Sequence, residues 1–299
     1  MTARHRAIGR RMARIPSVPP AARFPVSRGK SSFPWIFTGA LLVSIAFSLR
    51  QAQIDLHLLF DGHAAENVAR FVAGMFPPRL SADFLSLMMR PLVETLQISV
   101  MGTFIAVLIG IPLGLLATAS LSWSGILHER ASRSGRWLAG FLPYALARAL
   151  LSVFRAIPEY VWAFMFVRAL GLGAFPGVLA IGVAYGGMLG KVYSEILEGV
   201  SPRPLETLHA AGASRGGLVL YGLVPQALPN VVAYTLYRWE CAIRASAVLG
   251  FVGAGGLGQQ IELSMRMFQF DEVLTLLGIL FVLVAAVDFV SGRLRAWIA

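Results

Sequence analysis

The chain has 299 residues, of which 57% are hydrophobic and 14% are charged, about half the charged share of an ordinary soluble domain. A mean hydropathy of +0.69 leaves too little polar surface to coat a soluble globule, so composition indicates an integral membrane protein. The one cysteine, Cys241, excludes an intrachain disulfide and a metal site built from several cysteines.

Much of the formal net charge of +11 lies at the N-terminus, where residues 1–30 hold eight basic side chains and no acidic one. Basic runs can bind nucleic acid, but this one directly precedes an apolar segment, residues 31–50. We therefore predict a basic cytoplasmic tail that meets anionic membrane lipid, with no nucleic-acid partner. The apolar segment lacks a small-residue cleavage pattern, so it is expected to remain as a first transmembrane helix.

Six apolar stretches are predicted to cross the membrane, because each approaches the ~20 residues that a helix needs to span hydrocarbon. Residues 51–90 carry balanced charge and are predicted to be periplasmic, and residues 91–295 are predicted to form one all-α membrane domain. Six crossings place the N- and C-termini together in the cytoplasm. The expected spans are residues 31–50, 92–122, 143–167, part of 168–191, 229–252 and 273–290.

The segment 194–229 is too polar to cross lipid and is predicted to be a cytoplasmic loop. Its Glu206, Gly212 and Pro225 follow one another at the spacing of a Glu-Ala-Ala, Gly, Ile-x-Leu-Pro pattern. The stretch resembles the coupling-loop signature of ABC importer permeases. An ordinary loop with this spacing by chance is the alternative. Four positions depart from the signature: Thr207, Leu208, Gly222 and Val224.

Such a loop is expected to form a short amphipathic helix ending near Gly212 and a second short helix leading to Pro225. Together they would make a rigid knob that enters a cleft on a separate ATPase and carries its closing motion into the membrane. The residues expected to couple to the ATPase are Glu206, Ala210, Ala211, Gly212 and Pro225.

Two flanking regions look similar to phosphonate-type permeases. One runs from Tyr234 to Gln259, and the other includes Arg155-Ala-Ile-Pro-Glu159. The resemblance implies a MetI-like (type I ABC importer) fold in a bacterial inner membrane, two permease copies, identical or not, two ATPase subunits and a periplasmic binding protein. It implies transport of a phosphonate, phosphite or a related phosphorus oxyanion, with ATP bound by the partner, no cofactor and no catalytic residue in this chain.

Three charged residues, Arg238, Glu240 and Arg244, fall inside the predicted fifth span, where each is energetically costly. Glu240 and Arg244 are four residues apart and could pair on one helical face, with Arg238 near the inner interface. Alternatively, Arg238 or Arg244 faces the translocation pathway and attracts oxyanions. Glu159 could be a helix-packing partner or a cavity group.

Gly253, Gly255, Gly256 and Gly258 include the Gly-x-Gly-x-x-Gly spacing of a dinucleotide fold. That fold needs a preceding strand and a βαβ unit, whereas here a membrane span precedes, so we predict a re-entrant turn at the outer mouth. No histidine pair has metal-site spacing, which argues against an intramembrane protease. An ABC importer permease for another small solute, an ion-coupled transporter or a channel remains an alternative, although the paired repeats typical of ion-coupled transporters are not seen.

Overall fold

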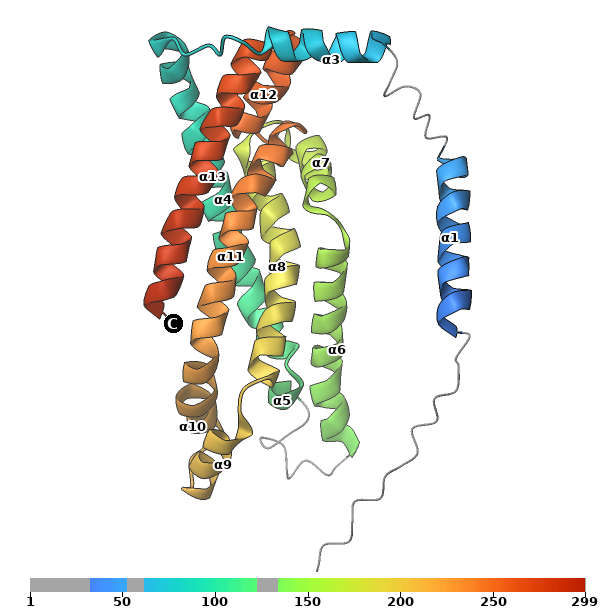
Figure 1. Ribbon diagram of the computed structural model, residues 1–299. Helices are drawn as coiled ribbons and strands as arrows, with labels where there is room; N and C mark the ends of the chain where they lie inside the picture. The colour runs from blue at the N-terminus through green and yellow to red at the C-terminus, as the bar shows by residue number, and fades with distance from the viewer. Residues whose placement is uncertain (1–32, 53–61, 123–133, 299) are drawn as a thin grey trace, which may run out of the picture. The chain divides into compact units, whose positions relative to one another are not determined.

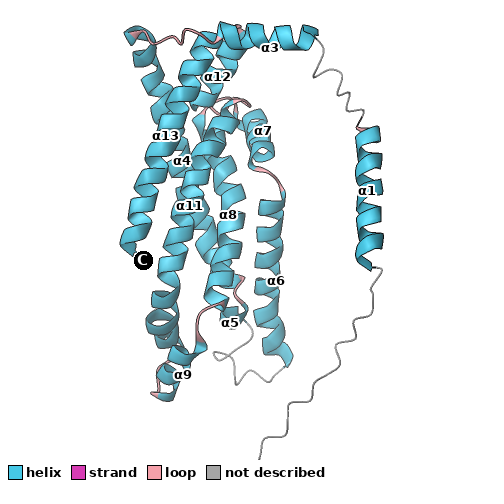
Figure 2. Cartoon of the chain, viewed as in Figure 1, coloured by secondary structure: helices cyan, strands magenta, loops and turns pink. Residues whose placement is uncertain are grey.

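The computed structural model describes residues 33–52, 62–122 and 134–298, and within these ranges every regular element is a helix (Figure 2). The chain divides into two compact units, residues 1–65 and 66–299. The first unit contains α1 (Phe33–Gln51), whose large apolar side chains are exposed. An apolar helix exposed all round suits lipid rather than water. The predicted basic tail, residues 1–30, lies outside the described residues.

The second unit is a bundle in which α4, α6, α8, α11 and α13 run alongside one another (Figure 1). Short helices connect them, and α3 begins just before the boundary between the two units. The bounds are α3 Gly62–Gly74, α4 Ala82–Leu116, α5 Ala119–Ser122, α6 Ser134–Ala156, α7 Glu159–Leu170, α8 Ala174–Glu198, α11 Val224–Gly250, α12 Gly256–Arg266 and α13 Phe270–Ile298.

Among the described residues, four helical stretches are long and apolar enough to cross a membrane. They correspond to α4, α8, α13 and the stretch Arg215–Gly250 that ends in α11. The pair α6 and α7 makes a fifth if counted as one broken span, and α1 supplies a shorter apolar helix. This number is compatible with the six predicted spans and with an all-α membrane fold.

The predicted span 143–167 is not one straight helix. α6 ends at Ala156, α7 begins at Glu159, and the two axes differ by 87°. The cause is Pro158, which lacks a backbone N–H and disfavours helical geometry at Ile157. Pro158 instead adopts an extended conformation, with φ −58° and ψ 147°, and precedes the first turn of α7.

The packing of α4 against α8 is built on glycines. An ideal Cβ on Gly102 would lie 2.8 Å from the side chain of Ile181, and one on Gly114 would lie 2.9 Å from the carbonyl oxygen of Gly190. On α8, a Cβ at Gly186 would come within 2.9 Å of Ile109. Small residues let two helices approach closely where lipid supplies no hydrophobic driving force between them. This contact forms the rigid centre of the bundle.

The two ends of the bundle carry different short elements (Figure 1). At one end, α9 (Pro202–Ala210), α10 (Arg215–Gly217) and the π-helix η2 (Leu218–Leu223) connect α8 to α11. At the other end lie α7 and α12. The predicted polar loop 194–229 is therefore shorter than expected. It loses residues 194–198 to α8 and residues 215–229 to a nearly continuous helical stretch, because apolar side chains there are buried against the bundle.

Candidate functional site

The turn after α9 is a helix-terminating motif centred on Gly212. Gly212 N–H donates to the His209 carbonyl at 2.9 Å, and Ala213 N–H donates to the Leu208 carbonyl at 3.0 Å. Gly212 has φ +85°, a conformation that costs little only for glycine. These two hydrogen bonds and the left-handed residue define a Schellman motif, which gives the helix a fixed end. The sequence prediction of a helix ending near Gly212 is confirmed.

A second helical stretch starts immediately afterwards. The Ser214 hydroxyl accepts a hydrogen bond from Gly217 N–H at 3.3 Å, as an N-cap residue does. From there α10, η2 and α11 follow without a break. The turn is therefore connected without interruption to α11, which is one of the bundle helices.

The return stretch packs closely on α9 through Gly222. An ideal Cβ on Gly222 would lie 2.5 Å from Leu205 Cδ2 and 3.1 Å from Leu208 Cδ1. Two of the departures from the family signature thus face each other: a leucine replaces alanine at 208 and a glycine replaces isoleucine at 222. The larger residue at 208 is thus accompanied by a smaller one at 222, and α9 and η2 can still pack closely. We call residues 201–225 the knob.

The predicted coupling residues lie on the surface of the knob. Glu206 and Ala210 are exposed on α9, and Ala211 and Gly212 are exposed in the turn. Pro225 is exposed at the second residue of α11. The apolar side of the knob is turned inward, with Leu218 and Leu223 buried. The arrangement is a rigid element with a free outer surface.

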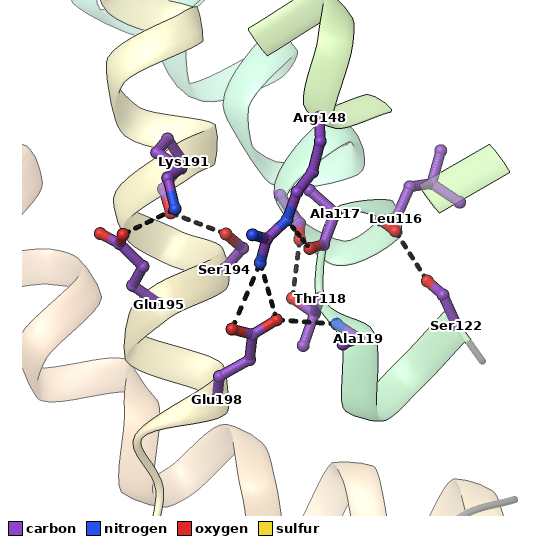
Figure 3. A network of polar contacts seen from close by, with 11 residues as sticks. Leu116, Ala117, Thr118, Ala119, Ser122, Arg148, Lys191, Ser194, Glu195 and Glu198 are labelled. Carbon is purple, nitrogen blue, oxygen red and sulfur yellow. Dashed lines mark hydrogen bonds and ion pairs between the residues drawn. The ribbon is translucent and has the colours of Figure 1, made fainter. Parts of the chain in front are cut away.

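A polar network, which the sequence prediction did not include, fixes the end of α8 just before the knob (Figure 3). Arg148 of α6 donates from Nη2 to the Glu198 carboxylate at 3.0 Å and from Nε to the Ala117 carbonyl at 3.1 Å. The same carboxylate accepts a hydrogen bond from Ala119 N–H at 2.8 Å. Glu198 therefore joins three helices at the root of the knob, a link that no local sequence pattern reveals.

At the opposite end, the glycines between α11 and α12 form a tight reversal. Gly253, Gly255 and Gly256 have φ of +90°, +84° and +72°. An ideal Cβ on Gly258, in the first turn of α12, would lie 1.8 Å from the Ala247 carbonyl oxygen. Glycine is thus required both for the turn and for the contact of α12 with α11. Most of the segment between the predicted fifth and sixth spans is helix α12, Gly256–Arg266.

Side chains of α4 hold this turn in place. Gly256 N–H donates to Glu94 Oε2 at 3.0 Å, and Leu257 N–H donates to Thr95 Oγ1 at 2.8 Å. The first N–H groups of a helix lack intrahelical partners and favour a negative charge. Glu94 supplies that charge at α12, so a carboxylate of the chain itself occupies the position that a dinucleotide fold would give to phosphate. The position of this turn at an outer mouth stays a prediction.

The charged residues of α11 do not pair as the sequence suggested. Glu240 is buried and accepts a hydrogen bond from Arg295 Nη2 of α13 at 2.6 Å. Arg244 instead lies 3.8 Å from the Asp288 carboxylate, also on α13. The expected Glu240–Arg244 pair is therefore wrong. Tertiary packing places α13 against Glu240, and a buried carboxylate requires a close partner.

Arg238 lies near the middle of the 27-residue helix α11 rather than at an end. Its Nε donates to the Tyr234 hydroxyl at 3.0 Å, and its guanidinium lies over the rings of Tyr185 and Tyr234. Glu159, at the N-terminus of α7, is half-buried. Among the described residues, no group of three or more metal-ligating side chains comes together.

Comparisons with known proteins agree on one family. The family described as "Binding-protein-dependent transport system inner membrane component" matches residues 131–299. The chain is 36% identical over 270 residues to "Putative phosphite transport system permease protein HtxC" of Stutzerimonas stutzeri, covering 90% of this chain and 88% of that one. It is 35% identical over 242 residues to "Phosphite transport system permease protein PtxC" of the same organism, covering 81% of each.

The fold is also that of a solved transporter. A chain from "Inward facing conformations of the MetNI methionine ABC transporter" superposes with a TM-score of 0.61 at 25% identity, covering 74% of this chain and 100% of that one. The MetI-like fold predicted from the coupling-loop resemblance is thereby confirmed. The chain is a multi-pass membrane protein of the binding-protein-dependent transport system inner membrane component family, the permeases of ABC importers.

Proposed function

We propose that this chain is the permease subunit of an ATP-driven importer for a phosphorus oxyanion such as phosphite or a phosphonate. The observation that carries the coupling role is the knob, a rigid and outwardly exposed element continuous with α11. The two Stutzerimonas relatives support the substrate class, because both are named for phosphite transport and match over most of their length.

The mechanism follows from how the knob is attached. A dimer of cytoplasmic ATPase subunits binds ATP, closes, and moves the exposed α9 surface with it. The Schellman turn and the Leu205–Gly222 contact keep the knob rigid, so the displacement passes into α11 rather than being absorbed. The network at Glu198 ties the same movement to α6 and to the α4–α5 junction. The ATPase binds and hydrolyses ATP, and this chain forms the translocation pathway for the substrate.

This function sets the orientation and the partners. The knob and both termini lie in the cytoplasm of a bacterial cell, and the α12 end faces the periplasm. A periplasmic binding protein delivers substrate there, and a second permease copy, identical or homologous, completes the pathway. In an importer the knob is the element that contacts the ATPase, whereas an ion-coupled transporter or a channel has no ATPase subunit to bind it. We therefore favour the importer.

Charge reversal on the knob tests the coupling. Glu206→Lys should abolish recovery of the ATPase subunit with the purified permease while leaving membrane insertion intact, because the changed side chain is exposed. The matched control is Asp83→Lys in the first turn of α4, an exposed acidic residue at the opposite end of the bundle. That control should retain the ATPase. Equal ATPase recovery by both variants would contradict a coupling role for the knob.

A further inference from the structure

One face of α11 is polar along the middle of the helix and is only partly covered by the rest of the bundle, against which Tyr234 and Cys241 pack. Its residues recur at spacings of three and four, which places them on one side of a helix. Of these, Asn230, Tyr237 and Arg244 are exposed and the other two are half-buried. We call this the α11 face, and its residues are Asn230, Tyr234, Tyr237, Cys241 and Arg244.

The α11 face is unsuited to lipid. Arg244 has 49% of its side chain exposed and Tyr237 is 45% exposed. Ionisable side chains in membrane helices turn toward the bundle interior or a water-filled cavity, because hydrocarbon does not solvate charge. By contrast, the exposed side of α13 presents Phe281, Val282 and Phe289. The charged residue that α13 adds near this face is Asp288, which pairs with Arg244. The α11 face therefore fits an aqueous path, whereas the Phe281, Val282 and Phe289 surface of α13 fits lipid.

Arg238 lies beside this face and extends onto α8. Its guanidinium carbon is 5.3 Å from the centre of the Tyr185 ring and 5.5 Å from that of Tyr234. The Nε–H is used by the Tyr234 hydroxyl, at 3.0 Å. In the part of the chain that the structure describes, no carboxylate forms an ion pair with Arg238. The two Nη groups, a planar fork of N–H donors, therefore have no anionic partner there.

The other charges of α11 are already paired. Glu240 is bound by Arg295, and Arg244 faces Asp288. Arg238 differs from them because its fixation comes from two aromatic rings and one hydroxyl, none of which neutralises its charge. Cation–π contacts and a single hydrogen bond hold the guanidinium in place while leaving it available to an anion.

We propose that Arg238, held between the rings of Tyr185 and Tyr234, binds the phosphorus oxyanion as it passes along the α11 face. A guanidinium fork matches two oxygens of such an anion and donates two charge-assisted hydrogen bonds at once. The assignment rests on the proposed function, since it names the site at which the proposed substrate binds.

Phospholipid headgroups carry the same chemistry and are the other source of a phosphorus oxyanion. Arg238 follows the start of α11 by 14 residues and precedes its end by 12. At 1.5 Å per residue it lies roughly 20 Å from either end. Headgroups gather near the ends of membrane helices, so this depth favours a small anion that enters the path over a lipid.

Uptake kinetics of the reconstituted transporter test the site. The permease is assembled with its ATPase and binding protein in vesicles, and ATP-driven uptake of phosphite and methylphosphonate is measured. Arg238→Ala should lower uptake about a hundredfold, since two charge-assisted hydrogen bonds are lost. Arg238→Lys keeps the charge without the fork and should lower it about tenfold. The matched control is Arg293→Ala, which removes an exposed arginine that lies over the Phe289 ring of α13, and it should behave as the wild type.

The outcomes separate the two proposals. If the wild-type assembly hydrolyses ATP but takes up neither anion, the proposed substrate class fails. If it takes up phosphite and both Arg238 variants match it, only the site is wrong.

Native mass spectrometry shows whether a phospholipid is bound to the purified permease. A phospholipid lost in Arg238→Ala with uptake unchanged would assign Arg238 to a headgroup and overturn the proposal. If the Arg238→Ala permease does not assemble, the test depends on the Arg238→Lys permease. Uptake at the wild-type rate by that variant would contradict the proposed site.

Discussion

Gly258 shows how a single missing methyl group permits a helix contact. A Cβ there would lie 1.8 Å from the carbonyl oxygen of Ala247, a backbone atom that cannot rotate away. Gly258→Ala should therefore lower the thermal stability of the purified permease, by about 1–3 kcal/mol as for other overpacked sites. The measurement is thermal unfolding in detergent.

Gly278 of α13 provides the matched control, because nothing lies within 4 Å of a Cβ placed on it. Gly278→Ala should leave the unfolding temperature unchanged or raise it slightly, since alanine restricts the unfolded chain. A Gly258→Ala permease as stable as the Gly278→Ala permease would show that α12 is not held as closely to α11 as described.

The partners of buried charges could not be predicted from sequence. Glu240 and Arg244 have the spacing of a helical ion pair, but Glu240 is bound by Arg295, 55 residues further along the chain. Likewise, Glu94 could be recognised as a charge near the start of a span, yet its role at Gly256 depends on a contact 162 residues away. Local spacing gives candidates, and tertiary packing selects among them.

At the scale of elements, the contact between Leu208 and Gly222 in the knob can be tested by changing the sizes of both side chains. Leu208→Ala should leave a gap on α9, and Gly222→Ile should force Leu205 and Leu208 away from η2. Each change alone is expected to loosen the knob and lower ATP-driven uptake. The double variant restores the alanine and isoleucine of the family signature and should recover part of the uptake, because the space vacated at 208 accepts part of the isoleucine side chain.

If the losses of uptake caused by Leu208→Ala and Gly222→Ile simply added in free energy, the two side chains would not compensate for each other. If the double variant is as impaired as the product of the single variants, the side chains at 208 and 222 do not share a contact in the working transporter. Recovery of the ATPase subunit, measured in parallel, shows whether the loss arises at docking. Membrane abundance of each variant is the control for folding.

Element ends were predictable where the chemistry is local. Gly212 fixes the end of α9 because a left-handed residue there closes two backbone hydrogen bonds. The 87° bend between α6 and α7 was not anticipated, although Pro158 was visible in the sequence. Proline is tolerated in many membrane helices, as Pro112 is inside α4. Whether a proline bends or breaks a span depends on its neighbours, and sequence alone does not supply them.

For the whole molecule, hydropathy indicated the helical spans but not which sides they present to lipid and to the path. α11 and α13 are both apolar enough to span, yet the α11 face exposes Tyr237 and Arg244 where α13 exposes Phe281 and Phe289. The difference arises from packing, because it depends on which side of each helix the bundle covers.

The two surfaces should differ in their access to water in the assembled transporter. In a Cys241→Ser background, Tyr237→Cys should react with a membrane-impermeant, water-soluble thiol reagent during turnover, because the α11 face meets the path. Phe281→Cys, at a site 74% exposed, should react only with a lipid-soluble reagent, since hydrocarbon excludes the charged one. Equal reactivity of the two cysteines toward the water-soluble reagent would mean that α13 also meets water. Protection of Tyr237→Cys from it throughout turnover would place the α11 face against protein or lipid, and the path would then have to run along another helix.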